Sequence, residues 1–167
     1  VFVETGTFMG VNARLHANNF KFVLSCEKVK EYYMQARQDS IFYKNLQIDW
    51  QDSPTYLKVF RQHYEKAKRN DIVIFYLDAH FYDTNLKPED RYVVLQELEA
   101  LKDFPNCIII IHDFDNGLGH ITYDGQPLDM SLLISDLMAV NPNFKFYTNT
   151  LESCDPYTTE TILDSKI

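Results

Sequence analysis

The chain has 167 residues, of which 46% are hydrophobic and 14% aromatic, so it is long enough to bury a full core and too apolar to be disordered. Its 24 acidic and 16 basic residues give a formal net charge of -8, which disfavours a nucleic-acid partner. The longest apolar run, the isoleucine stretch near residue 110, is too short to cross a bilayer. We therefore expect one soluble, cytoplasmic domain over residues 1–167, without a membrane partner. Its cysteines are expected to be reduced, and because the chain starts inside a strand, we expect that upstream residues have been trimmed or left out.

Strand-like and helix-like segments alternate along the chain. Short apolar runs that end in polar residues predict strands at 1–3, 20–27, 44–53, 71–80 and 106–117. Apolar residues at helical spacing predict helices at 11–19, 28–39, 53–67, 87–104 and 128–140. Because parallel neighbouring strands need a crossover, five such alternations indicate an α/β sandwich with a parallel sheet.

The last segment breaks this alternation. FKFYTNT at 144–150 and TTETILDS at 158–165 are both strand-like, and the seven residues between them leave no room for a helix. They predict an antiparallel hairpin. The expected fold is then a Rossmann-like three-layer sandwich whose mostly parallel, seven-stranded sheet ends in that hairpin.

Every predicted strand ends in a polar side chain, and in open α/β sheets ligands bind at these carboxyl ends. Each such residue alone could be a loop residue or a helix cap, but the whole row indicates a binding site. The residues are Glu4, Glu27, Asp52 with Ser53, Asp78 with His80, and His112 with Asp113.

The first of these strand ends carries the stretch VETGTFMG, with the pattern acid-x-Gly-x-x-x-Gly, and Glu27 closes the second strand. Motif, acid spacing and strand order together resemble class I S-adenosylmethionine-dependent methyltransferases. The resemblance implies that glycines of the turn approach the methionine part of the cofactor, that Glu27 accepts hydrogen bonds from both ribose hydroxyls, and that residues 51–53 face the adenine. The implied cofactor-binding set is Glu4, Gly6, Thr7, Gly10, Glu27, Asp52, Ser53 and Asp78.

A nicotinamide-binding fold is the enzymatic alternative. It requires G-x-G-x-x-G, with close glycines for the pyrophosphate, whereas this chain has GTFMG. Glu4 would repel a pyrophosphate but suits a cofactor that carries an ammonium and a sulfonium. Charge therefore favours S-adenosylmethionine over NAD.

The stretches YLDAHFYD and IIIHDFDNG resemble the strand ends that hold a divalent metal in small-molecule and sugar O-methyltransferases. By this resemblance Asp78, Asp113 and Asp115 are the metal ligands, with Phe114 where the family's second acid would stand. Asp78 and His80 are the expected catalytic residues, and His80 is the candidate general base because its pKa lies near working pH; a ligand or an ordinary loop histidine stays open. Strand alternation turns His112 to the opposite side from Asp113, so His112 is a less attractive candidate than His80.

These expectations lead to one function and two alternatives. The leading hypothesis is a methyl transfer from S-adenosylmethionine to a hydroxyl of a sugar, glycan or small molecule, assisted by Mg²⁺ or Mn²⁺. Phe81 replaces the lysine of catechol-type sites, which weakens the case for a catechol acceptor. A non-catalytic methyltransferase-like binding or structural domain, and the NAD-dependent oxidoreductase, are the alternatives; a homodimer is left open.

Overall fold

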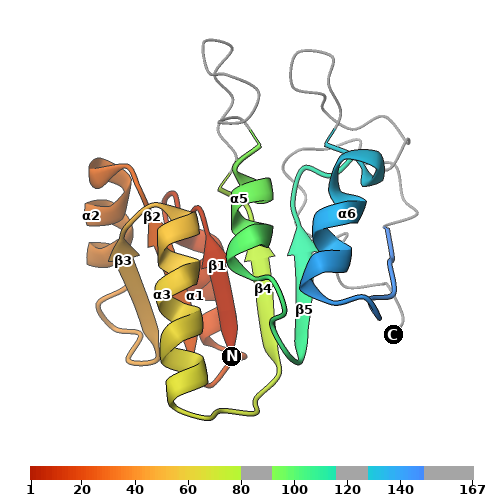
Figure 1. The fold of residues 1–167 in the computed structure, drawn as a ribbon. Helices are drawn as coiled ribbons and strands as arrows, with labels where there is room; N and C mark the ends of the chain where they lie inside the picture. Colours follow the sequence, from red (N-terminus) through yellow and green to blue (C-terminus); the bar gives the residue numbers. More distant parts are fainter. Residues whose placement is uncertain (80–91, 116–127, 149–167) are drawn as a thin grey trace.

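The computed structural model describes residues 1–79, 92–115 and 128–148, in which strands and helices alternate along the chain (Figure 1). The strands are β1 (Phe2–Thr5), β2 (Val23–Glu27), β3 (Leu46–Trp50), β4 (Val73–Leu77) and β5 (Cys107–Ile111). The helices are α1 (Val11–Ala17), α2 (Lys30–Asp39), α3 (Ser53–Lys66), α5 (Val93–Ala100) and α6 (Met130–Val140). The alternation predicted from the sequence is confirmed for these elements.

The five strands form one parallel sheet with the order β3-β2-β1-β4-β5. The chain builds outward from β1 to β3, then returns to the other side of β1 for β4 and β5. The strand order therefore reverses between β1 and β4, where Glu4 pairs with Tyr76 and Thr5 with Leu77. In open α/β sheets the crevice at such a reversal is where ligands bind.

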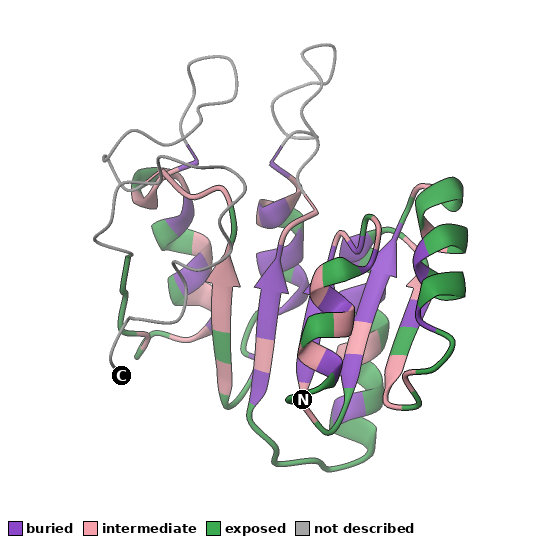
Figure 2. Ribbon diagram, turned by 180° about the vertical axis from the view of Figure 1, so that it is seen from behind, coloured by how far each residue is buried: buried purple, intermediate pink, exposed green. Residues whose placement is uncertain are grey.

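Helices cover both faces of the sheet. Figure 1 shows α3, α5 and α6 in front of the strands and α1 behind them. The period-two alternation of β1 divides its side chains between the two layers, because Phe2 packs with Ala13 of α1 while Val3 joins the core beneath α3 and α5. Figure 2 shows that β1 and β4 are mostly buried, whereas β5, at one edge of the sheet, has no fully buried residue.

Two helices begin at aspartates that cap them. The Asp52 side chain accepts the N–H of Thr55 at 3.0 Å at the start of α3, with Pro54 in the first turn. Asp129 accepts the N–H of Leu132 at 3.1 Å at the start of α6. Each carboxylate occupies an amide that has no partner within its own helix. Within the described ranges, no helix combines the length and the apolar character needed to cross a membrane.

The predicted seven strands and C-terminal hairpin are wrong for the part of the chain that the structure describes. The sheet there has five strands, all parallel, and residues 144–148 are not a strand. An alternating sequence forms a strand only when its apolar face finds a sheet to cover, and here Tyr147 is 76% exposed. The remaining residues of the predicted hairpin, 149–167, lie outside the described residues.

Candidate functional site

The turn after β1 contacts the end of β4 directly. Gly6 has a φ of +76°, and a Cβ added to it would lie 2.3 Å from the main-chain oxygen of Asp78. Only glycine combines the left-handed conformation with so close an approach. The turn is therefore held against Asp78 at the point where the strand order reverses.

The second glycine of the motif packs two helices together. Gly10 precedes α1 with a φ of +71°, and an added Cβ would lie 3.0 Å from the Cβ of Ala36 in α2. Both glycines thus have roles in the fold itself, beside the cofactor-binding role that the sequence motif implies.

Most amide groups of this turn are already used. The N–H groups of Gly6 and Thr7 both donate to the carbonyl oxygen of Cys26 at 3.1 Å, and the N–H of Gly10 donates to the carbonyl oxygen of Thr7 at 2.8 Å. The N–H of Phe8 donates to the Glu27 carboxylate. A pyrophosphate is bound through free amide groups at such a turn, so this geometry disfavours the dinucleotide alternative.

Glu4 lies inside β1 and is buried, with only 2% of its surface exposed. Its carboxylate accepts a hydrogen bond from Asn12 Nδ2 at 2.7 Å and another from Ser25 Oγ at 2.6 Å, and the Ser25 and Thr7 hydroxyls are 2.5 Å apart. Burial outweighs these hydrogen bonds and raises the pKa of Glu4 to about 7. Glu4 and Thr7, both predicted cofactor ligands, therefore form a network that ties the turn to β2.

Glu27 stands at the end of β2 and faces the same turn. One carboxylate oxygen accepts the N–H of Phe8 and the other the N–H of Val29, both at 2.8 Å. Each carboxylate oxygen can accept a second hydrogen bond, so both retain capacity for the hydroxyls of a ribose. Of the predicted cofactor ligands, Glu27 is the one whose geometry best suits that role.

Asp52 and Ser53 follow β3, as predicted, but both are engaged at the start of α3. Burial works against the ionised form of Asp52, and the hydrogen bonds from Thr55 overcome it, so the pKa of Asp52 lies below its ordinary value. Ser53 is buried. The hydrogen bond that caps α3 is a sufficient reason for an aspartate at position 52, with no ligand needed to explain it.

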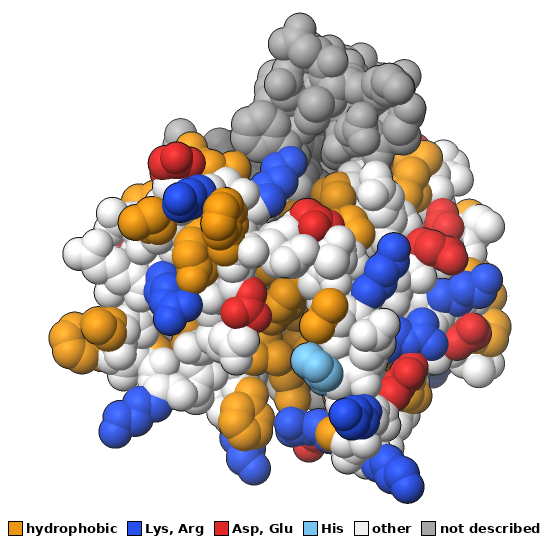
Figure 3. Space-filling view, turned by 60° about the vertical axis from the view of Figure 1, so that its left-hand side comes forward, with side chains coloured by type: hydrophobic (Ala, Val, Ile, Leu, Met, Phe, Trp, Pro, Cys, Tyr) orange, Lys and Arg blue, Asp and Glu red, His pale blue; other side chains and the backbone are white. Residues whose placement is uncertain are grey.

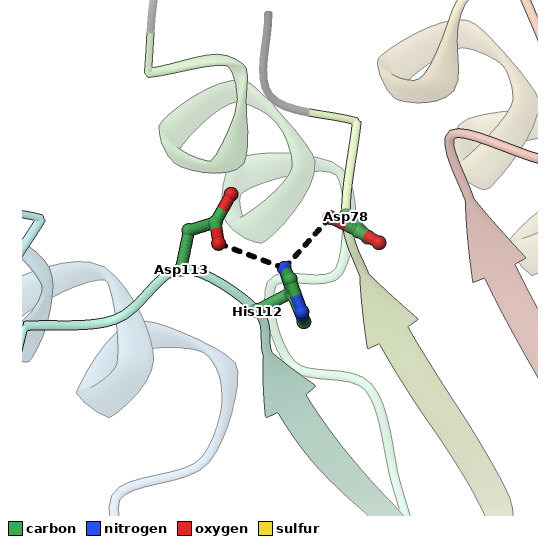
Figure 4. Close-up of side chains that lie close together, drawn as sticks. All are labelled: Asp78, His112 and Asp113. Atoms are coloured by element: carbon green, nitrogen blue, oxygen red, sulfur yellow. Dashed lines mark ion pairs between the residues drawn. The ribbon is translucent and has the colours of Figure 1, made fainter. Parts of the chain in front are cut away.

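A charged cluster follows the two neighbouring strands β4 and β5. His112 Nδ1 lies 3.1 Å from Asp78 Oδ1 and 3.0 Å from Asp113 Oδ1, so both carboxylates meet at one ring nitrogen (Figure 4). Ligand atoms of the three residues lie within 4.8 Å of one another. The side chains keep 43%, 33% and 20% of their surfaces exposed for His112, Asp78 and Asp113. A ligand can therefore reach the cluster.

The cluster corrects the prediction for His112. Side chains alternate between faces only along extended backbone, and here β5 ends at Ile111 and Asp113 has a φ of +55°. The left-handed residue turns the Asp113 carboxylate back toward His112. The signal available in the sequence was the HD pair directly after an apolar strand, which the alternation rule discounted.

The two carboxylates determine the charge of His112. Hydrogen bonds to Asp113 and Asp78 raise the pKa of His112 to about 10, against the opposing effect of burial. The imidazole is therefore a cation at neutral pH. The protonated His112 ring is thus a cation held between two carboxylates. A divalent metal ion could replace its Nδ1 proton and bind the same three side chains.

The other predicted residues of this site lie elsewhere. Asp115 does not belong to the cluster of three; together with Asp129 and Ser131 it lines an open cavity of about 280 Å³ beside α6. His80 lies outside the described residues. The metal-ligand set that the geometry offers is therefore Asp78, His112 and Asp113 in place of Asp78, Asp113 and Asp115.

A second cavity, of about 390 Å³, lies between α3 and the β2–β3 side of the sheet. Its walls include Leu24, Tyr56 and Phe60, and none of the strand-end acids at residues 4, 27, 52 and 78 lines it. Figure 3 looks onto this side of the molecule, where hydrophobic side chains lie in the hollow. Among the described residues, only Asp78, His112 and Asp113 form a group that could hold a metal ion, and none of the three lines this cavity.

Comparison of the chain with protein-family models found no match, and comparison with curated proteins found none either. The strand-end site itself consists of two halves. One half is the turn with Glu27 beside it, and the other is the cluster of Asp78, His112 and Asp113.

Proposed function

We propose that the protein is an S-adenosylmethionine-dependent O-methyltransferase that uses a divalent cation and acts on a hydroxyl of a sugar, glycan or other small molecule. One observation carries the proposal: Asp78 belongs to both halves of the site. Its main chain packs against Gly6 of the turn, and its side chain contacts His112. A methyl donor held at the turn and an acceptor held at the cluster would be neighbours.

The donor side depends on Glu27. A carboxylate that accepts two N–H groups and retains free lone pairs suits the paired hydroxyls of a ribose. The buried Glu4 network supports the turn from below, and the surplus of carboxylates suits a cofactor whose ammonium and sulfonium are positive.

The acceptor side depends on the charged cluster. Two carboxylates and an imidazole are a donor set for a divalent cation, and the imidazole favours Mn²⁺ or another transition metal over Mg²⁺. When bound, such a cation would acidify the acceptor hydroxyl and orient it. Methyl transfer is an in-line displacement, so the contribution of the chain's own residues is to hold the two reactants in line.

His112 is a poor candidate for general base in the absence of metal. With a pKa of about 10 the imidazole is protonated at neutral pH and cannot accept the hydroxyl proton. The cluster therefore favours cation binding over base catalysis. His80 stays a prediction for the base, since it lies outside the described residues.

The proposal is tested by calorimetric titration with S-adenosylmethionine and S-adenosylhomocysteine, each with and without Mn²⁺. Glu27→Gln should weaken cofactor binding at least tenfold, because the amide cannot accept from both ribose hydroxyls. Glu31→Gln, on the exposed face of α2, is the matched control and should bind as the unmodified protein does.

The metal half is tested separately. Asp113→Asn should abolish Mn²⁺ binding while the cofactor still binds, because Asp113 supplies a carboxylate to the cluster and is not one of the residues proposed to bind the cofactor. A folded protein that binds neither cofactor would contradict the proposal and favour the non-catalytic alternative.

A further inference from the structure

The cavity between α3 and the β2–β3 side of the sheet is large enough to hold a second ligand. Its volume of about 390 Å³ lies within the range of roughly 300 to 1,000 Å³ that is typical of small-molecule sites. Its apolar walls include Leu24 of β2, Val59 and Phe60 of α3, and Phe22 just before β2. Phe22 and Val59 are exposed although both are apolar. A molecule bound in this groove would cover these two side chains.

The groove has an acidic end and a basic end. The register of the sheet places Gln47 beside Leu24, and Asp49 lies two residues further toward the carboxyl end of β3. Gln47 Nε2 donates to both carboxylate oxygens of Asp49, at 3.1 and 2.9 Å. Phe22 and Arg69 line the opposite end, near the amino ends of the strands. Figure 3 shows hydrophobic side chains in the hollow and Lys and Arg side chains below it.

Two cations lie at the basic end of the groove. Arg69 Cζ and Lys21 Nζ each lie 5.4 Å from the centre of the Phe22 ring. Asp71 pairs with Arg69 Nε at 2.6 Å and so takes one of the five N–H groups of the guanidinium. Within residues 1–79, 92–115 and 128–148, Nη1 and Nη2 of Arg69 donate to no other group. Arg69 can therefore donate a pair of N–H groups to an anion.

We propose that this groove binds a small aromatic molecule that carries one carboxylate. The ring would pack against Phe60 and the other apolar walls, and the carboxylate would accept the terminal N–H groups of Arg69. Lys21 adds a second positive charge beside Arg69. Asp49 at the other end repels a second anionic group, so the charges of the groove orient the ligand. The site shares no residue with the turn or the charged cluster and does not depend on the proposed function.

The test uses 2-naphthoate as the probe and compares it with 2-naphthamide, which has the same shape without the charge. Calorimetry gives the affinity of each compound, and NMR shifts of the Leu24 and Val59 methyl groups locate the bound probe. Arg69→Gln removes the charge at the basic end, and Val59→Trp fills the groove from an exposed position of α3. Lys58→Gln, exposed on the same helix and outside the cavity, is the matched control.

The unmodified protein should bind 2-naphthoate about tenfold more tightly than 2-naphthamide, because the carboxylate gains charge-assisted hydrogen bonds. Arg69→Gln should reduce this ratio to about one and leave the 2-naphthamide affinity unchanged. A purely structural role of Arg69 would instead weaken both compounds together. Val59→Trp should abolish the binding of both, and Lys58→Gln should change neither.

Equal affinities for the two compounds in the unmodified protein, or no binding of either, would overturn the proposal. So would 2-naphthoate binding that Val59→Trp leaves intact, because the probe would then lie elsewhere. A concentration-dependent dimer that Val59→Trp dissociates would assign the groove to a second copy of the chain instead. If Arg69→Gln does not fold, Arg69→Lys takes its place and should lower the ratio, because lysine keeps the charge but not the paired N–H groups.

Discussion

The turn after β1 and the cluster after β4 and β5 are neighbours at one edge of the sheet, yet their charged groups are satisfied in different ways. Glu4 accepts hydrogen bonds from α1 and β2, Glu27 accepts them from the turn and from the start of α2, and both are buried. Asp78 and Asp113 instead share one histidine and remain partly exposed. The carboxylates of the first region are satisfied by the protein itself, whereas under the proposed function those of the second would exchange the His112 proton for a cation.

This difference shows that an acid at a strand end has two distinct uses. Where the backbone is closely packed, as at Gly6, the carboxylate fixes the turn. Where the chain turns at a left-handed residue such as Asp113, two carboxylates approach the same histidine.

Gly6→Ala should destabilise the protein most. The added methyl would overlap the main-chain oxygen of Asp78 and force an alanine into a left-handed conformation, for a cost of about 4 kcal/mol. Gly10→Ala meets only the Ala36 side chain at 3.0 Å and should cost about 2 kcal/mol. Urea denaturation measures both. Equal losses would show that conformation alone matters and that the contact with Asp78 does not.

The buried acids should make stability fall as pH rises. The pKa of Glu4 is raised from 4.5 to about 7, so the folded state holds a proton that the unfolded state has lost. Between pH 4.5 and 7 the free energy of unfolding should decrease by about 3 kcal/mol from this group alone. The pKa of Glu97 is also raised from 4.5 to about 7, so Glu97 should further lower the free energy of unfolding as pH rises.

Glu4→Gln should remove that contribution. The amide can still pair with Asn12 and Ser25 but does not titrate, so the loss of stability between pH 5 and 8 should be about 3 kcal/mol smaller than in the unmodified protein. Glu31→Gln, exposed on α2, should leave the pH dependence unchanged. An identical pH dependence in Glu4→Gln would show that Glu4 does not retain its proton on folding.

The sequence predicted the central part of the fold well because its signals there are local. Apolar runs and helical spacing depend on neighbouring residues, and the strands and helices that they predict appear in the structure. The strand predicted at 144–150 depended on a partner elsewhere in the chain. Periodicity cannot show whether such a partner exists, and in the described part it does not.

The site was predicted in part for the same reason. Parallel strands bring their carboxyl ends to one edge, so the proximity of Asp78 and Asp113 follows from topology. The contact between Asp113 and His112 follows from the left-handed φ angle of Asp113, which no residue pattern specifies. Asp115 was selected by its charge, but the chain had already turned toward α6 by that residue.

Mn²⁺ affinity should rise with pH if the cation replaces the His112 proton. With the pKa of His112 at about 10, one proton must be released on binding, so affinity should increase about tenfold per unit between pH 6.5 and 8.5. His112→Ala should bind more weakly and lose this dependence. His63→Ala, exposed on α3, is the control and should retain it.

The smallest expected effect concerns Asp52. Capping of α3 requires only an oxygen that accepts the Thr55 N–H, whereas the predicted role in cofactor binding depends on the carboxylate. Asp52→Ala removes the cap of α3 and should cost about 1 kcal/mol in urea denaturation. Asp52→Asn still accepts the Thr55 N–H and should be nearly as stable as the unmodified protein. If Asp52 only caps the helix, S-adenosylmethionine affinity should be the same in Asp52→Asn. A clear loss of S-adenosylmethionine affinity in this stable variant would place the Asp52 carboxylate at the adenine. An acid that caps a helix would then also bind ligand, as the carboxylates of the Asp78, His112 and Asp113 cluster are proposed to do.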